Sequence, residues 1–360
     1  MQDIHYYLGF NLVSGIGPTR LDRLIAFFGS LEDAWRADAG DLMMAGLDAR
    51  TTEALLETRR KRDLDAEYER VHRAGVRILS RDDPTYPSLL RQTVNGPPLI
   101  YVRGTFHEND RWALAVVGTR QCSTYGRDAT RRLVADLAGA GVTIVSGLAL
   151  GIDAIAHEAA LQAGGRTLAV LGSGVDQIYP GQNRQLGQAV IGQGALVSEY
   201  ALGTQPAAAN FPARNRIISG LSLGVLVVEA AARSGALITV QFALEQDRDV
   251  FAVPGSIFSP KSEGPHRLIR DGATIVTRAE DVLEALNMQN AVEQQAVAAA
   301  MPETAEEVAL LRLVEAEPRH IDAISRDSAL ALPVVSATLA MLELKGLIKQ
   351  VGGMQYVLAR

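Results

Sequence analysis

The chain of 360 residues contains one cysteine, Cys122, and six histidines that never recur at close spacing. A single cysteine excludes a disulfide framework, and scattered histidines exclude a Cys/His metal cage, so we expect no structural zinc. The sequence has no apolar run near the roughly 20 residues that cross a bilayer, and its start lacks a basic segment followed by an apolar one. We therefore expect a soluble, cytoplasmic protein with no metal and no membrane partner.

Lysine is also scarce, because 31 of the 35 basic residues are arginines. The net charge is −6, and the acidic excess lies in residues 1–75 and 286–360, whereas residues 76–285 are balanced. Arginine suits forked contacts to phosphate and stacking on bases. An acidic chain can still bind nucleic acid if its arginines converge on one face.

Residues 1–75 form the first predicted domain, which is helical because its apolar residues recur at spacings of three and four. Leu12–Leu21 carries Gly15 and Gly17 in the pattern of a helix-hairpin-helix turn, whose backbone N–H groups can hold a phosphate. A simple tight turn between packed helices explains the same glycines equally well. Met43–Asp48 resembles half of the same motif.

Residues 76–286 form the second predicted domain, in which short apolar runs alternate with amphipathic helical stretches. This pattern predicts a doubly wound, mostly parallel, Rossmann-like α/β sheet with ligands at the carboxyl ends of its strands. The expected strands are Trp112–Val117, Thr143–Val145, Thr167–Leu171, Ala195–Ser198, Leu223–Val228, Asp249–Val253 and Thr274–Val276.

Residues 287–304 are interpreted as a linker because they lack aromatics, and residues 305–360 as a winged helix of three helices and a two-stranded wing. The third of these helices, Val334–Lys345, contains no arginine. It is therefore poorly suited to reading a major groove, and we favour a protein-interaction or structural role for this domain.

Four glycine-rich turns follow strands of the predicted sheet. Each combines glycines with hydroxyl side chains and is expected to open a helix whose N–H groups face the same edge. Together they predict a crevice lined with phosphate-binding groups, although ordinary strand-to-helix turns have similar sequences. The residues proposed for this crevice are Gly118, Thr119, Arg120, Ser146, Gly147, Gly172, Ser173, Gly174, Ser234 and Gly235.

Phe211–Arg216 adds two arginines, one on either side of Asn215, shortly after a proline. We expect an extended segment here that fans its side chains toward a ligand. With Arg120 and Arg184, the residues Arg214 and Arg216 would give four guanidinium groups able to bind successive phosphates. The structural alternative is that Arg214 or Arg216 pairs with a carboxylate, either Glu199 or Glu229.

Cofactor binding and catalysis are both disfavoured. The sequence has no Gly-Lys dipeptide, which excludes a P-loop, and no complete G-x-G-x-x-G, so we expect no nucleotide cofactor. Asp153 and His157 lie four residues apart and suggest an acid–base pair, but a helix cap at Asp153 and a packed His157 explain them better. Glu229 is expected to brace a loop and Cys122 to fill space. We expect no catalytic residue.

Ordered matches over about 200 residues resemble the DNA-processing protein A family, called DprA or Smf. The motifs that carry this resemblance are Val116–Arg120, Tyr125–Gly126, Val145–Ala154, Ala156–His157, Ile178–Pro180, Ser198–Tyr200, Phe211–Pro212, Arg214–Leu221, Ser234–Thr239 and Phe251–Gly255. The flanks fit a longer family architecture, with an N-terminal sterile-alpha-motif-like domain and a C-terminal winged helix.

The resemblance implies an extended Rossmann fold that binds single-stranded DNA without turnover and delivers it to the RecA recombinase in natural transformation. It also implies a homodimer formed through Gly264–Ile275, with His266, Ile269 and Ile275 on that surface; the alternative places both isoleucines in the core. Some relatives have a lysine after the Tyr-Pro pair, where this chain has Gly181. That phosphate contact is then lost or taken over by Arg184.

Two other functions remain open at this point. Cytokinin-activating phosphoribohydrolases have a similar Rossmann variant, but their Pro-Gly-Gly-x-Gly-Thr signature is absent here, and Ser234–Leu237 lacks its glycine cluster. A winged-helix regulator of duplex DNA is the second alternative, and the third helix, which has no net charge, argues against it.

Overall fold

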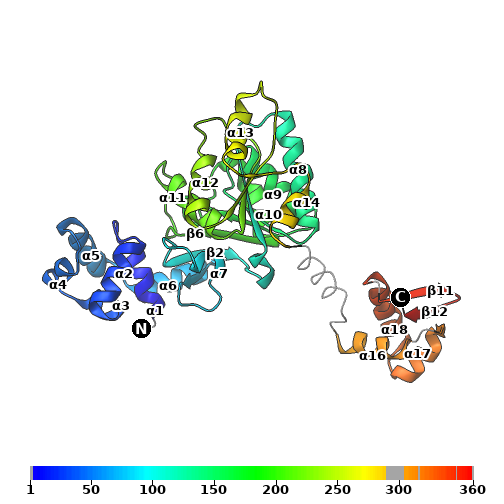
Figure 1. Ribbon diagram of the computed structural model, residues 1–360. Helices are drawn as coiled ribbons and strands as arrows, with labels where there is room; N and C mark the ends of the chain where they lie inside the picture. The colour runs from blue at the N-terminus through cyan, green and yellow to red at the C-terminus, as the bar shows by residue number, and fades with distance from the viewer. Residues whose placement is uncertain (1–2, 289–303, 315–316, 346, 359–360) are drawn as a thin grey trace. The chain divides into compact units, whose positions relative to one another are not determined.

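The computed structural model describes residues 3–288, 304–314, 317–345 and 347–358 (Figure 1). The chain divides into two compact units, Met1–Leu286 and Asn287–Arg360, which are described separately. Most of the expected linker at residues 287–304 lies outside the described residues. None of the described helices is both long and apolar enough to cross a membrane.

The first unit begins with short helices, as the apolar spacing predicts. They are α1 (Asp3–Asn11), α2 (Pro18–Phe28), α3 (Leu31–Arg36), α4 (Ala39–Met44), α5 (Ala49–Lys61) and α6 (Leu64–Arg73). Their buried side chains, among them Phe10 and Trp35, form one apolar cluster that continues to Tyr101 in the sheet.

The turn between α1 and α2 places Gly15 at a φ of 95°, a conformation that favours glycine. The carbonyl oxygen of Gly15 accepts a hydrogen bond from Arg20, which also contacts Asp48 at the start of α5. Arg20 thus connects the turn at Gly15 with the end of the Met43–Asp48 turn. Phosphate binding by the Gly15 turn stays a prediction.

Within the described residues, the centre of the first unit is a nine-stranded sheet in the order β1-β2-β6-β5-β4-β3-β7-β8-β9. Strands β3 to β9 pair in parallel, which confirms the Rossmann-like prediction. The strands are β1 (Arg77–Ser80), β2 (Leu99–Gly104), β3 (Ala113–Val117), β4 (Thr143–Ser146), β5 (Thr167–Val170), β6 (Gly194–Ser198), β7 (Gly224–Val227), β8 (Asp249–Ala252) and β9 (Thr274–Ile275).

Strands β1 and β2 were not among the expected strands. They extend the sheet beyond β6, because β2 pairs with β6 and β1 pairs with β2, both in antiparallel orientation. The segment that forms β2, Leu99–Gly104, begins with four fully buried residues, Leu99 to Val102. This short apolar run is typical of a strand covered on both faces.

Helices connect the strands and cover both faces of the sheet. Figure 1 shows α11 and α12 on one face and α8, α9, α10 and α14 on the other. The bounds of the helices in this part of the chain are α7 (Ser88–Arg91), α8 (Thr124–Gly139), α9 (Ile152–Gln162), α10 (Arg184–Gln193), α11 (Asn210–Gly220), α12 (Ala236–Glu245), α13 (Glu263–Arg270) and α14 (Ala279–Ala285). The strand order reverses between β3 and β7, so the carboxyl ends of these two strands flank the switch point at which such sheets bind ligands.

The second unit has the elements of a winged helix, as expected. They are α16 (Ala305–Leu313), β10 (Arg319–His320), α17 (Ile321–Ser328), α18 (Leu332–Leu344), β11 (Ile348–Gly352) and β12 (Gln355–Leu358). Its core includes Leu310, Ile324 and Leu339. Helix α18 exposes Val334 and Met341, and its role in binding stays a prediction.

Candidate functional site

A crevice of about 800 Å³ lies at the switch point, beyond the carboxyl end of β3. Its walls come from the turn after β3, the turn after β4, helix α11 and the start of α12. It brings together seven of the residues proposed from the sequence, which are Gly118, Thr119, Arg120, Arg214, Asn215, Ser234 and Gly235.

The other proposed residues do not line this crevice: Ser146, Gly147, Gly172, Ser173, Gly174, Arg184 and Arg216. Ser146 and Ser173 are buried, and their hydroxyls donate to the carbonyl oxygens of Val116 and Gln177, each at 2.7 Å. Arg184 lies exposed in the first turn of α10.

The Phe211–Arg216 segment is helical, which corrects the expectation of an extended chain. It forms the first two turns of α11, and Pro212 lies in the first turn, where a missing N–H costs nothing. Because successive residues of an α-helix are about 100° apart, Arg214 and Arg216 project from nearly opposite sides. They cannot act as adjacent phosphate-binding groups.

Arg214 is buried in the floor of the crevice. One guanidinium nitrogen donates to the carbonyl of Gly147 at 2.7 Å and also to that of Val170. A β-carbon at Gly147 would lie 2.5 Å from the guanidinium, so glycine is required for this approach. Burial lowers the pKa of Arg214 to about 10, partly opposed by nearby Asp153. The side chain stays charged at neutral pH and anchors two strand ends.

Arg216 pairs with Glu199 at 2.6 Å, as the structural alternative predicted for one of these arginines. Both side chains are largely buried, and burial raises the pKa of Glu199 while Arg216 opposes the rise. Arg216 is therefore committed to an internal ion pair.

Arg120 differs from both of these arginines because it is exposed at the mouth of the crevice. Its guanidinium carbon lies 5.8 Å from the centre of the Phe211 ring, and that ring lies 5.7 Å from the ring of Tyr179. The sequence pointed to both aromatic residues only as parts of motifs and missed their place in the site. An arginine next to two aromatic rings can contact a phosphate and a base together.

Asp153 does not cap α9, contrary to the expectation. The residue that caps this helix is Gly151, whose φ is 80°. The Asp153 carboxylate instead accepts hydrogen bonds from the backbone N–H groups of Gly147 and Ala149, at 3.1 and 3.4 Å. Burial raises its pKa, which Arg214 and these N–H groups oppose. Asp153 thus fixes the shape of the turn after β4.

His157 lies on α9 and is fully buried, which confirms the expectation of a packed histidine. Its Nδ1 lies 2.6 Å from the hydroxyl oxygen of Thr167. Burial lowers the pKa of the imidazole to about 3, so the ring is neutral in the folded protein at pH 7.

Three of the four glycine turns lead directly into a helix, namely those that precede α8, α9 and α12. In the first, Glu229 accepts a hydrogen bond from the backbone N–H of Ser123 at 2.8 Å and braces the turn as expected. The turn at Gly172–Asp176 is the exception, because α10 starts only at Arg184. Its N–H groups therefore do not belong to a helix start.

The segment expected at the dimer surface forms α13 and the edge strand β9. The side chain of Ile275 is 48% exposed, so the alternative that placed it in the core is wrong. Ile269 is half-buried on α13, and His266 of the same helix contacts the carbonyl of Gly255 at 3.0 Å.

No group of three potential metal-binding side chains occurs among the residues that the structure describes.

Comparison with known proteins identifies relatives over nearly the whole chain. The profile of the family "DNA recombination-mediator protein A" matches residues 77–287, and that of the "DprA winged helix domain" matches residues 294–354. Protein Smf of Synechocystis is 36% identical and covers 98% of both chains. Protein Smf of Escherichia coli is 43% identical over 88% of this chain and 86% of that protein.

Two solved structures are similar as well. DNA processing protein A of Streptococcus pneumoniae aligns with a TM-score of 0.68 and 37% identity, over 78% of this chain and 97% of that chain. The Helicobacter pylori protein, whose structure is described as showing its single-stranded DNA binding mode, aligns with a TM-score of 0.53 and 29% identity, over 59% and 95%. These relatives support a function in DNA processing and recombination.

Proposed function

The chain belongs to the DNA recombination-mediator protein A family, and we propose that it binds single-stranded DNA in the crevice between β3 and β7. The observation that carries this proposal is Arg120, an exposed guanidinium beside the aromatic pair Tyr179 and Phe211. Backbone phosphates would contact the arginine, and bases would stack on the rings without sequence readout.

The residues of the crevice take different parts in this proposal. Gly118, Thr119, Asn215, Ser234 and Gly235 supply exposed or half-exposed polar groups next to Arg120 along the wall. Arg214 and Asp153 add opposite charges in the floor and hold the turn after β4 in place. Arg184, three residues beyond Gly181, would contact the strand as it leaves the crevice.

The remaining residues proposed from the sequence act by shaping the crevice from behind. Ser146 ends β4 and Gly147 begins the turn after it, and Arg216 anchors α11 through Glu199. Gly172, Ser173 and Gly174 form the buried turn after β5, where the hydroxyl of Ser198 donates to the Ser173 carbonyl at 2.7 Å.

We further propose that the protein protects incoming strands and delivers them to the RecA recombinase in natural transformation, without enzymatic turnover and without a cofactor. A homodimer formed through α13 and β9 would place two crevices in one particle and hold two strands together. The exposed side chain of Ile275 on the edge strand favours this surface.

One experiment separates this function from its two alternatives. Binding of a single-stranded oligonucleotide and of a duplex of equal length is measured at matched salt, alongside release of adenine from AMP. Tighter binding of the single strand, falling with salt, and no base release are expected. Equal or tighter duplex binding would favour the winged-helix regulator, and base release would favour the phosphoribohydrolase.

A further inference from the structure

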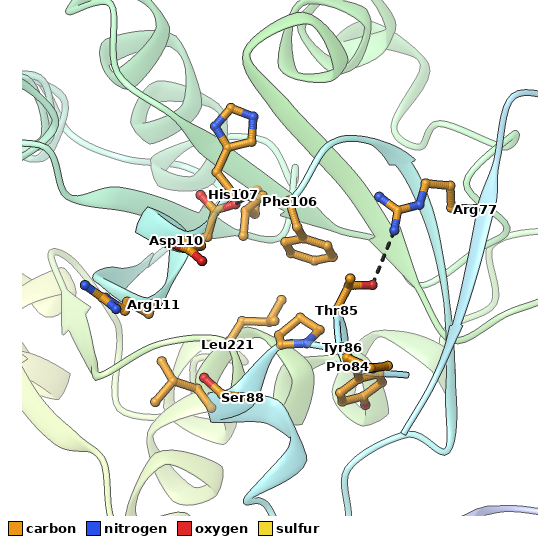
Figure 2. Close-up of a pocket in the computed structure, with 14 residues that line it drawn as sticks. Arg77, Pro84, Thr85, Tyr86, Ser88, Phe106, His107, Asp110, Arg111 and Leu221 are labelled. Carbon is orange, nitrogen blue, oxygen red and sulfur yellow. Dashed lines mark hydrogen bonds between the residues drawn. The ribbon is translucent and has the colours of Figure 1, made fainter. Parts of the chain in front are cut away.

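A second cavity, of about 420 Å³, lies at the opposite end of the parallel strands from the crevice. Leu168, near the start of β5, and Leu221, just before β7, belong to its lining. One wall is the segment Pro84–Leu89, which enters α7, and the other is Phe106–Arg111, the segment that leads into β3. Figure 2 shows the ring of Phe106 and the side chain of Leu221 pointing into the hollow from opposite sides.

Both walls are fixed to the body of the sheet by half-buried arginines. Arg248 donates to the carbonyl of Leu89 at 2.9 Å and holds the first wall. Arg166 donates to the carbonyl of Thr105 at 2.8 Å and holds the second. The cavity is therefore formed before any ligand arrives, which reduces the entropic cost of binding.

The inner surface of the cavity is apolar. Phe106, Leu168 and Leu221 carry no hydrogen-bonding side-chain atoms. The hydroxyl of Tyr86 is already used, because it donates to the carbonyl of Pro97 at 2.6 Å, so Tyr86 offers its ring. A ligand group that enters this floor must itself be apolar, since a polar edge would lose its hydrogen bonds to water.

The rim of the cavity carries two guanidinium groups at opposite ends, Arg77 and Arg111 (Figure 2). Arg77 donates to the neutral hydroxyl of Thr85 at 3.3 Å, and Arg111 stacks on the ring of Trp112 at 5.4 Å. Neither forms an ion pair with a carboxylate of the described residues at 4.0 Å or less.

The acidic residues of the cavity do not cancel this positive charge. Asp110 is neutralised by Arg166, whose Nε and terminal nitrogen each lie 2.9 Å from its carboxylate. Glu108 is the remaining carboxylate of the lining, against two unneutralised arginines. The rim therefore favours an anionic ligand.

We propose that this cavity binds an acidic peptide segment of a partner protein, which inserts one large apolar side chain into the floor and places carboxylates beside Arg77 and Arg111. A volume of about 420 Å³ accommodates such a side chain together with its neighbouring backbone. A nucleotide fits less well because the floor would leave the polar edges of its base without partners. This inference does not depend on the proposed strand-binding function.

The test uses the full-length protein and a fluorescein-labelled peptide, Asp-Glu-Asp-Leu-Phe, followed by fluorescence anisotropy. Two control peptides replace the acidic residues with lysine or the Leu-Phe pair with serine. Arg77→Glu reverses one rim charge, and Ser88→Trp fills the cavity from an exposed position in its lining. Arg73→Glu changes an exposed residue of α6 outside the cavity and is the matched charge control.

We expect the acidic peptide to bind at least tenfold more tightly than either control peptide. Arg77→Glu and Ser88→Trp should each weaken peptide binding at least tenfold. Arg73→Glu should change the peptide affinity less than twofold. The affinity of these variants for single-stranded DNA should also change less than twofold. The proposal is overturned if the three peptides bind alike or if both cavity variants bind the peptide like the wild type. Displacement of the peptide by thymidine monophosphate would also overturn it, in favour of a nucleotide site.

Discussion

Three arginines near the crevice have the same charge and different tasks. Arg214 is buried against backbone carbonyls, Arg216 is paired with Glu199, and Arg120 is exposed beside Phe211. Charge alone therefore does not identify a DNA contact. The side chain that is free to meet a phosphate is the one without an internal partner.

Arg120→Ala is expected to weaken single-stranded DNA binding and leave the fold intact, because the side chain is exposed. The slope of log affinity against log salt should become shallower by roughly 0.7, the value for one phosphate contact on a single strand. Binding isotherms at several salt concentrations measure both. Arg127→Ala, an exposed arginine of α8 outside the crevice, is the control. An unchanged slope for Arg120→Ala would place the strand elsewhere.

Gly181→Lys is expected to strengthen single-stranded DNA binding. A β-carbon at this position has no atom within 4 Å, and the residue follows Tyr179 and Pro180 at the edge of the crevice. An added lysine should steepen the salt slope by roughly 0.7. Binding isotherms at several salt concentrations measure this slope, with Gly181→Gln as the uncharged control. Equal gains from lysine and glutamine would refute a phosphate contact.

We predict that the buried His157 lowers the free energy of unfolding in acid. Burial lowers the pKa of the folded imidazole to about 3, whereas an unfolded histidine titrates near 6.5. Between these values the unfolded state binds a proton that the folded state does not, so the stabilisation present at pH 7 falls as the pH drops below 6.5. From pH 7 to pH 5 this residue should cost about 2 kcal/mol.

Urea unfolding of the wild type and of His157→Gln at pH 7 and pH 5 tests this expectation. The variant lacks the titrating ring, so its free energy of unfolding should fall less, by about 2 kcal/mol, than that of the wild type. Asp153 and Glu199 have raised pKa values and act in the opposite direction, equally in both proteins. Parallel losses in the two proteins would exclude His157 as the cause.

Among the elements, the parallel strands were the most predictable. Runs such as Leu223–Val228 are apolar throughout because helices cover both faces, and β7 occupies Gly224–Val227 within that run. Strands β1 and β2 were missed because they are antiparallel additions at one edge, outside the repeating strand–helix pattern. Pro212 favours an extended chain at Phe211–Arg216 in the sequence, but proline is tolerated in the first turn of a helix, and the segment is part of α11.

The site was predictable only in part, for a related reason. Glycine turns at strand ends placed Gly118, Thr119 and Arg120 correctly in the crevice. Which arginines are used internally depends on contacts between distant segments, such as Arg216 with Glu199. Such contacts have no local signature in the sequence.

Helix α13 and strand β9 form the surface through which we expect the protein to self-associate. Ile275→Glu, at an exposed edge position, should give a folded monomer, and Ile269→Glu on α13 should do the same. Sedimentation velocity at micromolar concentration measures the oligomeric state, and thermal melting checks the fold. Val94→Glu, which alters an exposed loop residue, is the control. A monomeric wild type, or dimeric isoleucine variants, would exclude this surface.

On the scale of the whole molecule, several places can be imagined for a DNA strand. They are the crevice between β3 and β7, the Gly15 turn between α1 and α2, and helix α18 of the winged helix. The crevice combines an exposed arginine, two aromatic rings and the start of α12, whereas α18 contains no arginine. We therefore propose that the DNA strand binds in the crevice alone.

Hydrogen–deuterium exchange of the full-length protein, with and without a single-stranded oligothymidine, tests this placement most directly. We predict slower exchange in residues 118–126, 147–153 and 234–240, which surround the crevice, and unchanged exchange in residues 12–20 and 332–344. Protection confined to the Gly15 turn or to α18, with the crevice segments unaffected, would contradict the account.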